Sequence, residues 1–464
     1  MSGFNLNFLL SSVKALESVI FHEFGGFPAL IIILMCTGLF FSLYLGFPSI
    51  VNFRHALKEI TKDSEKDGGL LKSKQSLFTS LSSVVGMGSI AGIASMICFD
   101  AGPGAVLWLA IMVIFGMNTS FAETLLAVKY RNVDMEKKSI DCAPVMYIKK
   151  SFAEMNLTKL GLVLSVIYGA MYFIGLLGAQ IYQVKEATNL LTGFKSLQNA
   201  GTIITIVFAA IISISVLGGI TGVAKILEKL LPIACGSYLV CVFIILIFNI
   251  RQLPLALLTI LKEAFRPKAM AGGIVGVMSY GIQRGTYCNE AGLGSATTPY
   301  TAMESDNPVK IAGLGSMNPL FVGAICLATG LMVVSSGVHL KSAAFNGSGI
   351  LSVMNVFVTT SRWLGYMLCA VIPMLTLSLC ISSASNAQNV YRHYFGRKTN
   401  ILFILICFGV IALSAFIETK VAMDVADILY LSIAIPNIFC LFMSRKIIKD
   451  FYKTNRDALL ADSK

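Results

Sequence analysis

Long apolar stretches separated by short polar connections run through most of the 464-residue chain. A membrane-spanning helix needs about 20 predominantly apolar residues, and the pattern predicts about eleven such spans. The predicted spans cover residues 28–47, 76–99, 103–127, 160–190, 202–219, 229–250, 271–296, 310–336, 352–386, 400–418 and 424–444. The predicted fold class is therefore an all-α integral membrane protein.

The composition agrees with a chain surrounded by lipid. Hydrophobic residues make up 56% of the sequence and charged residues 13%, which is too few charges for an ordinary water-soluble surface. The net charge of +12 does not predict a nucleic-acid partner here, because the basic residues gather in connections between the spans. The lipid bilayer and small solutes are the expected partners.

Basic residues also predict the orientation in the membrane. They cluster at 54–74, 129–150, 392–398 and after Arg445, in connections that alternate along the chain and are expected in the cytoplasm. An odd number of spans then places the N-terminus outside. The connection 251–268 is an exception, since its basic residues would face outward. The sequence predicts a multi-pass protein of the inner (plasma) membrane.

The two ends of the chain are predicted to lie on opposite sides of this membrane. Residues 1–27 are expected to form a periplasmic amphipathic segment, because mixed charge precedes the first long apolar run. Residues 445–464 are expected to form a basic cytoplasmic tail.

Glycine is concentrated in two of the predicted spans. If the extra first span, 28–47, is set aside, ten spans form two groups of five, 76–250 and 271–444. Each group begins with a glycine-rich stretch, "SSVVGMGSIAG" at 82–92 and "AGGIVGVMSYGIQRGTYCNEAGLGS" at 271–295. Many secondary transporters consist of two inverted five-helix repeats whose first helices are broken at the binding site. The alternative is close helix packing of the GxxxG kind, which "GSIAG" also fits.

A broken helix offers ligands from its own backbone. Freed N–H groups at a half-helix N-terminus suit a carboxylate, and freed carbonyls suit a bare cation. The amides of Met87 and Gly88 are therefore expected to meet a substrate carboxylate, and the expected substrate-binding residues are Gly86, Met87, Gly88, Gln183, Gly273, Ser279 and Ser383.

Hydroxyls and carbonyls near the first glycine-rich stretch predict a sodium site. Ser378 and Ser382 are one helical turn apart on the ninth span and could complete it, although serine hydroxyls in helices also bond to their own preceding turn. The expected sodium ligands are Ser82, Val84, Val85, Ser89, Ser378 and Ser382. No cofactor is expected besides this coupling ion.

Polar residues elsewhere in the spans are costly without a partner and so indicate function or structure. Gln180 and Gln183 share a face of the fourth span, and an amide can hold both ends of a zwitterion. Glu123, Arg284 and Glu290 are expected near the inner ends of their spans. Together with Asn289 they are interpreted as gating or structural residues rather than substrate contacts.

Two long motifs resemble the sodium:alanine symporter family, also called alanine or glycine:cation symporters. They are "SLSSVVGMGSIAGIASMICFDAGPGAVLWLAIMVIFGMNTSFAETLLAVKYR" and "YGIQRGTYCNEAGLGSA". The resemblance implies a leucine-transporter-type fold with eleven spans and sodium-coupled uptake of small amino acids such as alanine or glycine. It also implies a site in the broken second and seventh helices, with Gln183 as the family's glutamine.

The chain resembles a divergent member, because it departs from the family pattern at several positions. Ser89 stands where the family usually has Asn beside the cation, and a Cys-Ala-Pro sequence at 142–144 replaces Gly-Gly-Pro. Phe321 and Val322 align with an Asp-Thr pair, and Ser383 aligns loosely with a Trp. Loss of the indole predicts a wider pocket, and altered oxygen ligands leave proton coupling open.

The sequence therefore predicts a secondary active symporter that imports a small neutral amino acid, L or D, with sodium by alternating access. The alternative is a proton-coupled permease for a somewhat larger amino acid. A membrane-embedded enzyme is disfavoured, because the sequence contains neither HExxH nor GxSxG. A channel is disfavoured because a broken-helix site for both a carboxylate and a cation favours binding and alternation.

Overall fold

A computed structural model gives the arrangement of the chain. It describes residues 23–24, 27–61, 70–134, 136, 139–193, 199–266, 273–303, 307–345, 347–396, 400–417, 428 and 430–461. The predicted amphipathic segment at 1–27 lies almost entirely outside these residues, as do 462–464 of the predicted basic tail.

The described chain is helical apart from two small antiparallel hairpins, which pair β1 (Glu23–Phe24) with β2 (Phe27–Pro28) and β3 (Val133–Asp134) with β4 (Ser139–Ile140). The helices are α2 (Ala29–Leu45), α3 (Pro48–Val51), α4 (Phe53–Thr61), α5 (Ser73–Val84), η1 (Met87–Ser89), α6 (Ala91–Ser95), η2 (Met96–Asp100), α7 (Ala105–Lys129), α8 (Ala143–Glu154), α9 (Thr158–Thr192), α10 (Gly201–Ser215), η4 (Val216–Gly218), α11 (Gly219–Phe248), α12 (Leu253–Glu263), α13 (Gly273–Asn289), η5 (Ser295–Thr297), α14 (Thr298–Thr301), α15 (Pro308–Ser335), η6 (Val338–Phe345), α16 (Gly349–Thr360), α17 (Arg362–Phe395), α18 (Asn400–Leu413), α20 (Ala434–Met443) and α21 (Arg445–Ala461).

In the part of the chain that the structure describes, each predicted span overlaps a helix or a helix pair. Among the described residues, five helical segments are long and apolar enough to cross a membrane, and two bent helix pairs raise this number to seven. One of the five, Gly201–Phe248, comprises α10 and α11 joined through η4. Helices α2 and α18 are shorter but apolar throughout.

The ninth predicted span, 352–386, is wrong in its bounds. The chain forms two helices here, because Ser361 is extended (φ −162°, ψ 136°) and interrupts the helix. The long helix α17 begins at Arg362 and continues to Phe395, nine residues beyond the predicted end. The interruption coincides with a short polar run at 359–362, which averaging over a membrane-length stretch conceals.

The first helix of each predicted repeat is broken. The chain leaves α5 at Val84, passes Val85 and Gly86 in extended conformations and continues as η1 and α6, with a bend of 70°. Helix α13 ends at Asn289, and the chain turns there through three residues with positive φ, Glu290, Gly292 and Gly294. The second break therefore lies near the end of its glycine-rich stretch, whereas Gly273 opens a continuous helix.

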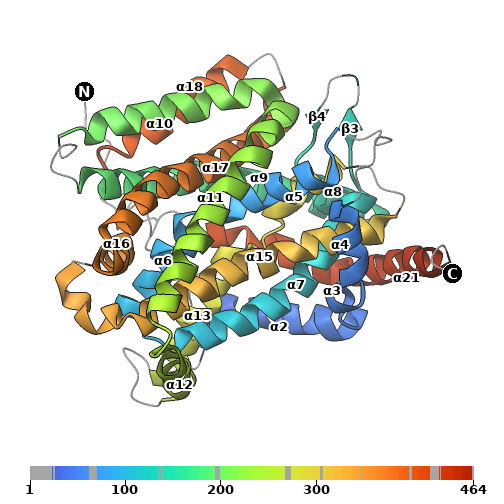
Figure 1. The fold of residues 1–464 in the computed structure, drawn as a ribbon. Helices are drawn as coiled ribbons and strands as arrows, with labels where there is room; N and C mark the ends of the chain where they lie inside the picture. The colour runs from blue at the N-terminus through green and yellow to red at the C-terminus, as the bar shows by residue number, and fades with distance from the viewer. Residues whose placement is uncertain are drawn as a thin grey trace.

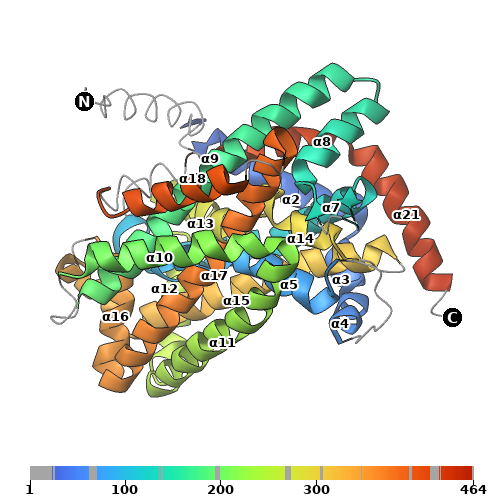
Figure 2. The same cartoon turned by 90° about the horizontal axis from the view of Figure 1, so that it is seen from above.

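Helices α7 and α15 lie side by side at the centre of the molecule, with α5, α6 and α13 against them (Figure 1). Two glycines of α15 allow this close approach, because a Cβ at Gly323 would lie 2.5 Å from Val113 and one at Gly315 2.1 Å from Thr124. Helices α9, α10, α17 and α18 form a second group, seen beside the first in Figure 2. The first broken helix joins the two groups, because α5 packs against α17 and η1 against α9.

Two helices rich in charged residues, α4 and α21, pack on one end of α15. Asn52, just before α4, donates its side-chain amide to the Tyr452 hydroxyl of α21 at 3.0 Å. The predicted basic tail is therefore largely a packed helix.

Candidate functional site

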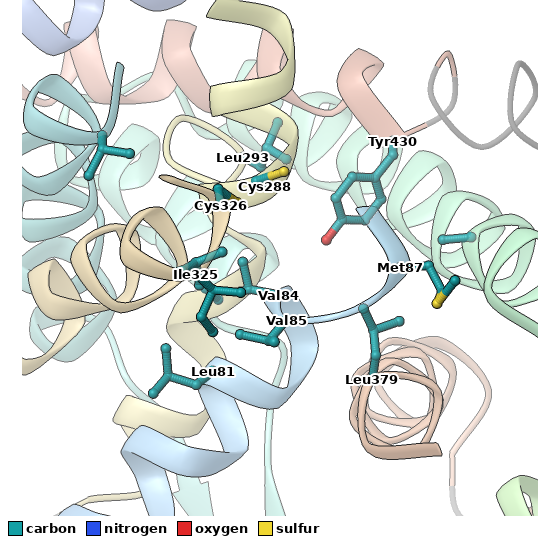
Figure 3. Close-up of a cluster of buried hydrophobic side chains, with 14 of the residues drawn as sticks. Leu81, Val84, Val85, Met87, Cys288, Leu293, Ile325, Cys326, Leu379 and Tyr430 are labelled. Carbon is teal, nitrogen blue, oxygen red and sulfur yellow. The ribbon is translucent and has the colours of Figure 1, made fainter. Parts of the chain in front are cut away.

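A buried cavity lies where the two broken helices meet α9 and α17. Its free volume is about 20 Å³, which is room for about one water molecule. The residues that line it are Ser83, Val84, Gly88, Ser89, Ala179, Gln183, Tyr287, Cys288, Glu290, Leu379, Ser383 and Tyr430. Figure 3 shows the unwound backbone between Val85 and Met87, with Leu379 and Tyr430 on either side of it.

Most of the expected substrate-binding residues lie at this cavity. Gly88, Gln183 and Ser383 line it, and Gly86 and Met87 form the adjoining unwound segment. Gly273 and Ser279 do not line it, because α13 continues unbroken from Gly273 to Asn289. Ser279 is buried in that helix, ten residues before its end, and its hydroxyl has no partner among the described residues.

Gln183 joins the middle of α9 to the first break. Its Oε1 accepts a hydrogen bond from the backbone N–H of Met87 at 2.7 Å. A Cβ added at Gly86 would lie 2.9 Å from that oxygen and 2.2 Å from Cδ1 of Leu379. Only glycine therefore fits at position 86. Gln180 is also buried, but it contacts the Cys407 thiol instead of the cavity.

The opposite wall of the cavity comes from the end of α13. Tyr287 faces the first break, since a Cβ at Gly88 would lie 3.0 Å from its Cε1. The ring of Tyr430 lies 5.9 Å from that of Tyr287, and its hydroxyl donates to Glu290 Oε1 at 2.5 Å. Ser295 donates to the other carboxylate oxygen of Glu290, also at 2.5 Å. Glu290 is thus held by two hydroxyls beside the cavity.

Three of the expected sodium ligands gather next to the cavity, between α5 and α17. The Ser378 hydroxyl donates to that of Ser82 at 3.1 Å, and Ser382 donates to the Thr79 carbonyl at 2.9 Å. Ser82 itself donates to the Phe78 carbonyl of its own helix at 2.7 Å. The Ser82 hydroxyl therefore bonds to the preceding turn of its own helix, whereas the hydroxyls of Ser378 and Ser382 face α5. All three hydroxyls are buried and none is charged, which suits a hard cation.

The remaining expected sodium ligands lie around the break itself. Val84 lines the cavity and Val85 follows it in the extended segment. Ser89 lines the cavity on the side of α15, where its hydroxyl lies against the Cys326 thiol. Ser89 is thus separated from the group around Ser378, which faces α17.

Glu123 and Asn289 hold the second break in place. Asn437 of α20 donates to Glu123 Oε1 at 2.6 Å and to the Gly292 carbonyl at 2.8 Å. Tyr147 donates to the amide oxygen of the same asparagine. The Asn289 side chain accepts from the N–H of Ala291 at 3.0 Å and so caps the end of α13. Both residues therefore contact the second break, and their gating or structural role stays a prediction.

Arg284 lies between the two broken helices, on the α6 side of the cavity. Its guanidinium carbon is 5.9 Å from the centre of the Tyr287 ring, and its Nη1 would lie 3.4 Å from a Cβ at Gly92. The carboxylate of Asp100, at the far end of η2, interacts with it electrostatically. Arg284 therefore bridges α13 to the α6 and η2 half of the first broken helix, whereas Glu290 lies in the second break.

The other departures from the family pattern lie away from the cavity. Phe321 is 40% exposed on α15, and Val322 is buried there without lining the cavity. The chain 142–144 begins α8, where the N–H of Ala143 donates to the Thr298 hydroxyl at 3.2 Å. Only Ser89 and Ser383 among the departures line the cavity.

Sequence reasoning missed several lining residues, chiefly Tyr287, Cys288, Leu379 and Tyr430. Tyr287 and Cys288 are part of the "QRGTYCNEAGLGS" motif and could have been found by following the motif to the end of the helix. Leu379 lies one turn before Ser383 on α17, so helical periodicity also indicates it. Tyr430 has no sequence signal, because only tertiary packing brings it to Glu290.

Comparison with known proteins agrees with this geometry. The chain matches the sodium:alanine symporter family over residues 8–462. The sodium/alanine symporter AgcS of Methanococcus maripaludis is 29% identical over 426 residues, which cover 90% of this chain and 91% of AgcS.

Two solved transporters share the fold at low sequence identity. MhsT, solved in complex with L-phenylalanine, superposes with a TM-score of 0.58 at 14% identity, covering 80% of this chain and 88% of MhsT. A sodium-coupled sialic acid symporter superposes with a TM-score of 0.55 at 14% identity, covering 83% of this chain and 82% of the symporter. The predicted leucine-transporter-type fold is confirmed. The chain is a multi-pass membrane transporter and not an enzyme, and it belongs to the sodium:alanine symporter family.

Proposed function

We propose that the protein imports a small neutral amino acid, alanine or glycine, together with sodium by alternating access. The observation that carries this proposal is the meeting of both broken helices at one buried cavity, with the Gln183 amide on one wall and the serine group of α5 and α17 beside it. Family membership supports sodium-coupled amino-acid symport, and AgcS is by its name a sodium/alanine symporter.

The backbone amides of the first break are the proposed partners of the substrate carboxylate. The N–H of Met87 already donates to an amide oxygen, that of Gln183, so this N–H is directed toward an acceptor. A carboxylate could take the place of Gln183 Oε1, and the rotated amide could then donate its own N–H to the substrate. The half-helix dipole at η1 and α6 favours the negative charge.

The amino group of the substrate would face the oxygen atoms on the other side of the cavity. The Ser383 hydroxyl of α17 is the proposed polar contact there, whereas Glu290, whose two oxygens already accept from Tyr430 and Ser295, keeps its gating or structural role. The side chains of Leu379 and Tyr287 approach the first break closely, which limits the room for a substrate side chain. This crowding favours a small amino acid, although Ser383 replaces the bulky residue that the family pattern led us to expect.

Sodium is proposed to bind between Ser82, Ser378 and Ser382, with backbone carbonyls from the end of α5. An ion there would contact α5 and α17 at once, and so would hold the first broken helix against the second group of helices. Loss of the ion would release that contact, which couples sodium binding to the opening of the site. Glu123, Arg284, Asn289 and Glu290 are the proposed gating or structural residues.

A proton-coupled permease is the second candidate. It is favoured by one observation, the buried carboxylate of Glu290, whose partners are the hydroxyls of Ser295 and Tyr430. A carboxylate in such surroundings can carry a proton without disrupting a salt bridge. The proposed orientation, with the N-terminus outside and the C-terminus in the cytoplasm, is the same for both candidates.

Uptake of labelled alanine, glycine and serine of both hands into proteoliposomes tests the proposal. Under an imposed sodium gradient we expect accumulation of alanine or glycine, and under a proton gradient alone we expect none. Uptake that follows the proton gradient and ignores sodium would favour the second candidate. Gly88→Leu should abolish substrate binding, because the new side chain would meet Tyr287, whereas Gly222→Leu, with open space around it, should not.

A further inference from the structure

Two cysteines lie next to each other beside the candidate cavity, and one of them lines it. Cys288 is near the end of α13 and lines the cavity, and the side chain of Cys326 on α15 lies beside it. Both cysteines are free, and both are buried. Figure 3 shows the two side chains adjacent to one another, above Val84.

This thiol pair contacts the first broken helix. The Cys288 thiol donates to the carbonyl of Gly88, with an Sγ to oxygen distance of 3.5 Å. The hydroxyl of the neighbouring Ser89 lies against the Cys326 thiol. The pair therefore touches two consecutive residues of η1, the turn whose amides are proposed to bind the substrate.

Close packing holds both cysteines in place. Gly285, one turn before Cys288, lies so close to α7 that an added Cβ would be 2.8 Å from Cβ of Met112. Helix α15, which carries Cys326, packs along the same α7. Because both helices rest on α7, the two thiols remain neighbours unless a whole helix shifts.

We propose that Cys288 and Cys326 are a redox-modification site, which a small neutral oxidant of the peroxide class converts to a disulfide. The oxidant reaches Cys288 through the cavity, so this inference rests on the proposed function of the cavity as a substrate site. With hydrogen peroxide, an S–S bond forms and the O–O bond breaks. The two thiols lose two protons and two electrons, and both oxygens leave as water.

The disulfide would impair the substrate site in two ways. It removes the S–H group that donates to the Gly88 carbonyl, and a buried acceptor without its donor is unfavourable. It also joins α13 to α15, which restricts movement of the second broken helix. We expect oxidation to lower the rate of substrate uptake about tenfold, a factor that corresponds to about 1.4 kcal/mol.

Thiol mapping on the full-length protein in proteoliposomes tests the site directly. After peroxide treatment, alkylation and proteolysis, mass spectrometry should find the Cys288 and Cys326 peptides joined by a disulfide, and dithiothreitol should separate them. Cys380 of α17 and Cys407 of α18 form a matched control, since they are also buried neighbours but do not line the cavity. If both pairs remain fully alkylated, or both oxidise equally, the proposal is wrong.

Uptake measurements test the consequence. Peroxide should inhibit the unmodified protein reversibly, Cys326→Ser or Cys326→Ala should transport normally and resist inhibition, and Cys380→Ser should remain sensitive. Inhibition that persists in both Cys326 variants would overturn the proposed effect. If the reduced protein shows no sodium-driven uptake while the disulfide still forms, then the proposed function fails and the thiol site stands.

Discussion

Gln183 Oε1 accepts a hydrogen bond from the backbone N–H of Met87 at 2.7 Å, so the fourth predicted span is joined directly to the broken second span. Gln183→Leu removes this acceptor from a buried backbone donor and deletes the amide proposed to hold the substrate. We expect the KM for substrate to rise about tenfold or more, from the loss of at least one buried hydrogen bond. Uptake kinetics in proteoliposomes measure this change.

Gln180→Leu is the matched control for this prediction. Gln180 has the same side chain on the same helix and is equally buried, but it does not line the cavity. Equal losses of transport in the two variants would contradict a substrate role for Gln183.

Removing a hydroxyl between α5 and α17 should weaken the binding of sodium. Ser378→Ala or Ser382→Ala deletes one neutral oxygen ligand, and we expect the sodium concentration for half-maximal uptake to rise about tenfold. The substrate KM at saturating sodium should change little. Ser316→Ala is the control, because that hydroxyl bonds within its own helix. An unchanged sodium dependence in both α17 variants would rule out this cation site.

Gly86→Ala should abolish transport by a steric clash that a second substitution relieves. The new Cβ would lie 2.2 Å from Cδ1 of Leu379, which is closer than any van der Waals contact. Leu379→Ala vacates that space, so the double variant should recover substrate binding in part. Gly218→Ala has open space around it and should behave as the unmodified protein. Failure of Leu379→Ala to restore any binding would contradict a clash with Leu379 as the cause, and would leave the 2.9 Å contact with Gln183 Oε1 or the backbone as the source of the defect.

An acid-sensitive contact outside the membrane links α17 to the hairpin before α8. Nδ1 of His393 lies 3.4 Å from Oδ1 of Asp141, and Asn132 donates to the other oxygen at 2.7 Å. The hydrogen bond with His393 is the main cause that lowers the pKa of Asp141 below its ordinary value. A carboxyl with a lowered pKa stabilises the folded state at pH values above its ordinary pKa of about 4. This contribution is lost as the pH falls through the lowered pKa.

Asp141→Asn should therefore lower the melting temperature at neutral pH by about 1–2 °C, and the difference from the unmodified protein should shrink in acid. Thermal unfolding in detergent at a series of pH values measures this. Asp450→Asn, at an exposed position of α21, is the control. A pH-independent difference for Asp141→Asn would contradict the pKa argument.

Hydropathy predicted the membrane helices well, because the cost of burying polar backbone in lipid leaves a strong signal in the sequence. It did not locate the interruption at Ser361, because the polar run of Thr359, Thr360, Ser361 and Arg362 is short and long apolar stretches lie on both sides of it. Glycine content indicated both broken helices. It was misleading about the position of the second break, because Gly273 lies in an ordinary helix. The described glycines of this stretch that adopt positive φ are Gly292 and Gly294, near its end. Tyr430 reaches the cavity through tertiary packing with Glu290, which no local pattern records.

The two breaks differ in backbone geometry, and this difference predicts which of them can act as a hinge. At the first break Gly86 and Ile90 keep negative φ values of −158° and −118°, so this segment could rewind into a helix without any φ changing sign. At the second break Glu290, Gly292 and Gly294 have φ values of 54°, 92° and 74°, and each would have to change sign. The second break is therefore a fixed corner, and motion between the outward and inward states is expected to concentrate at the first.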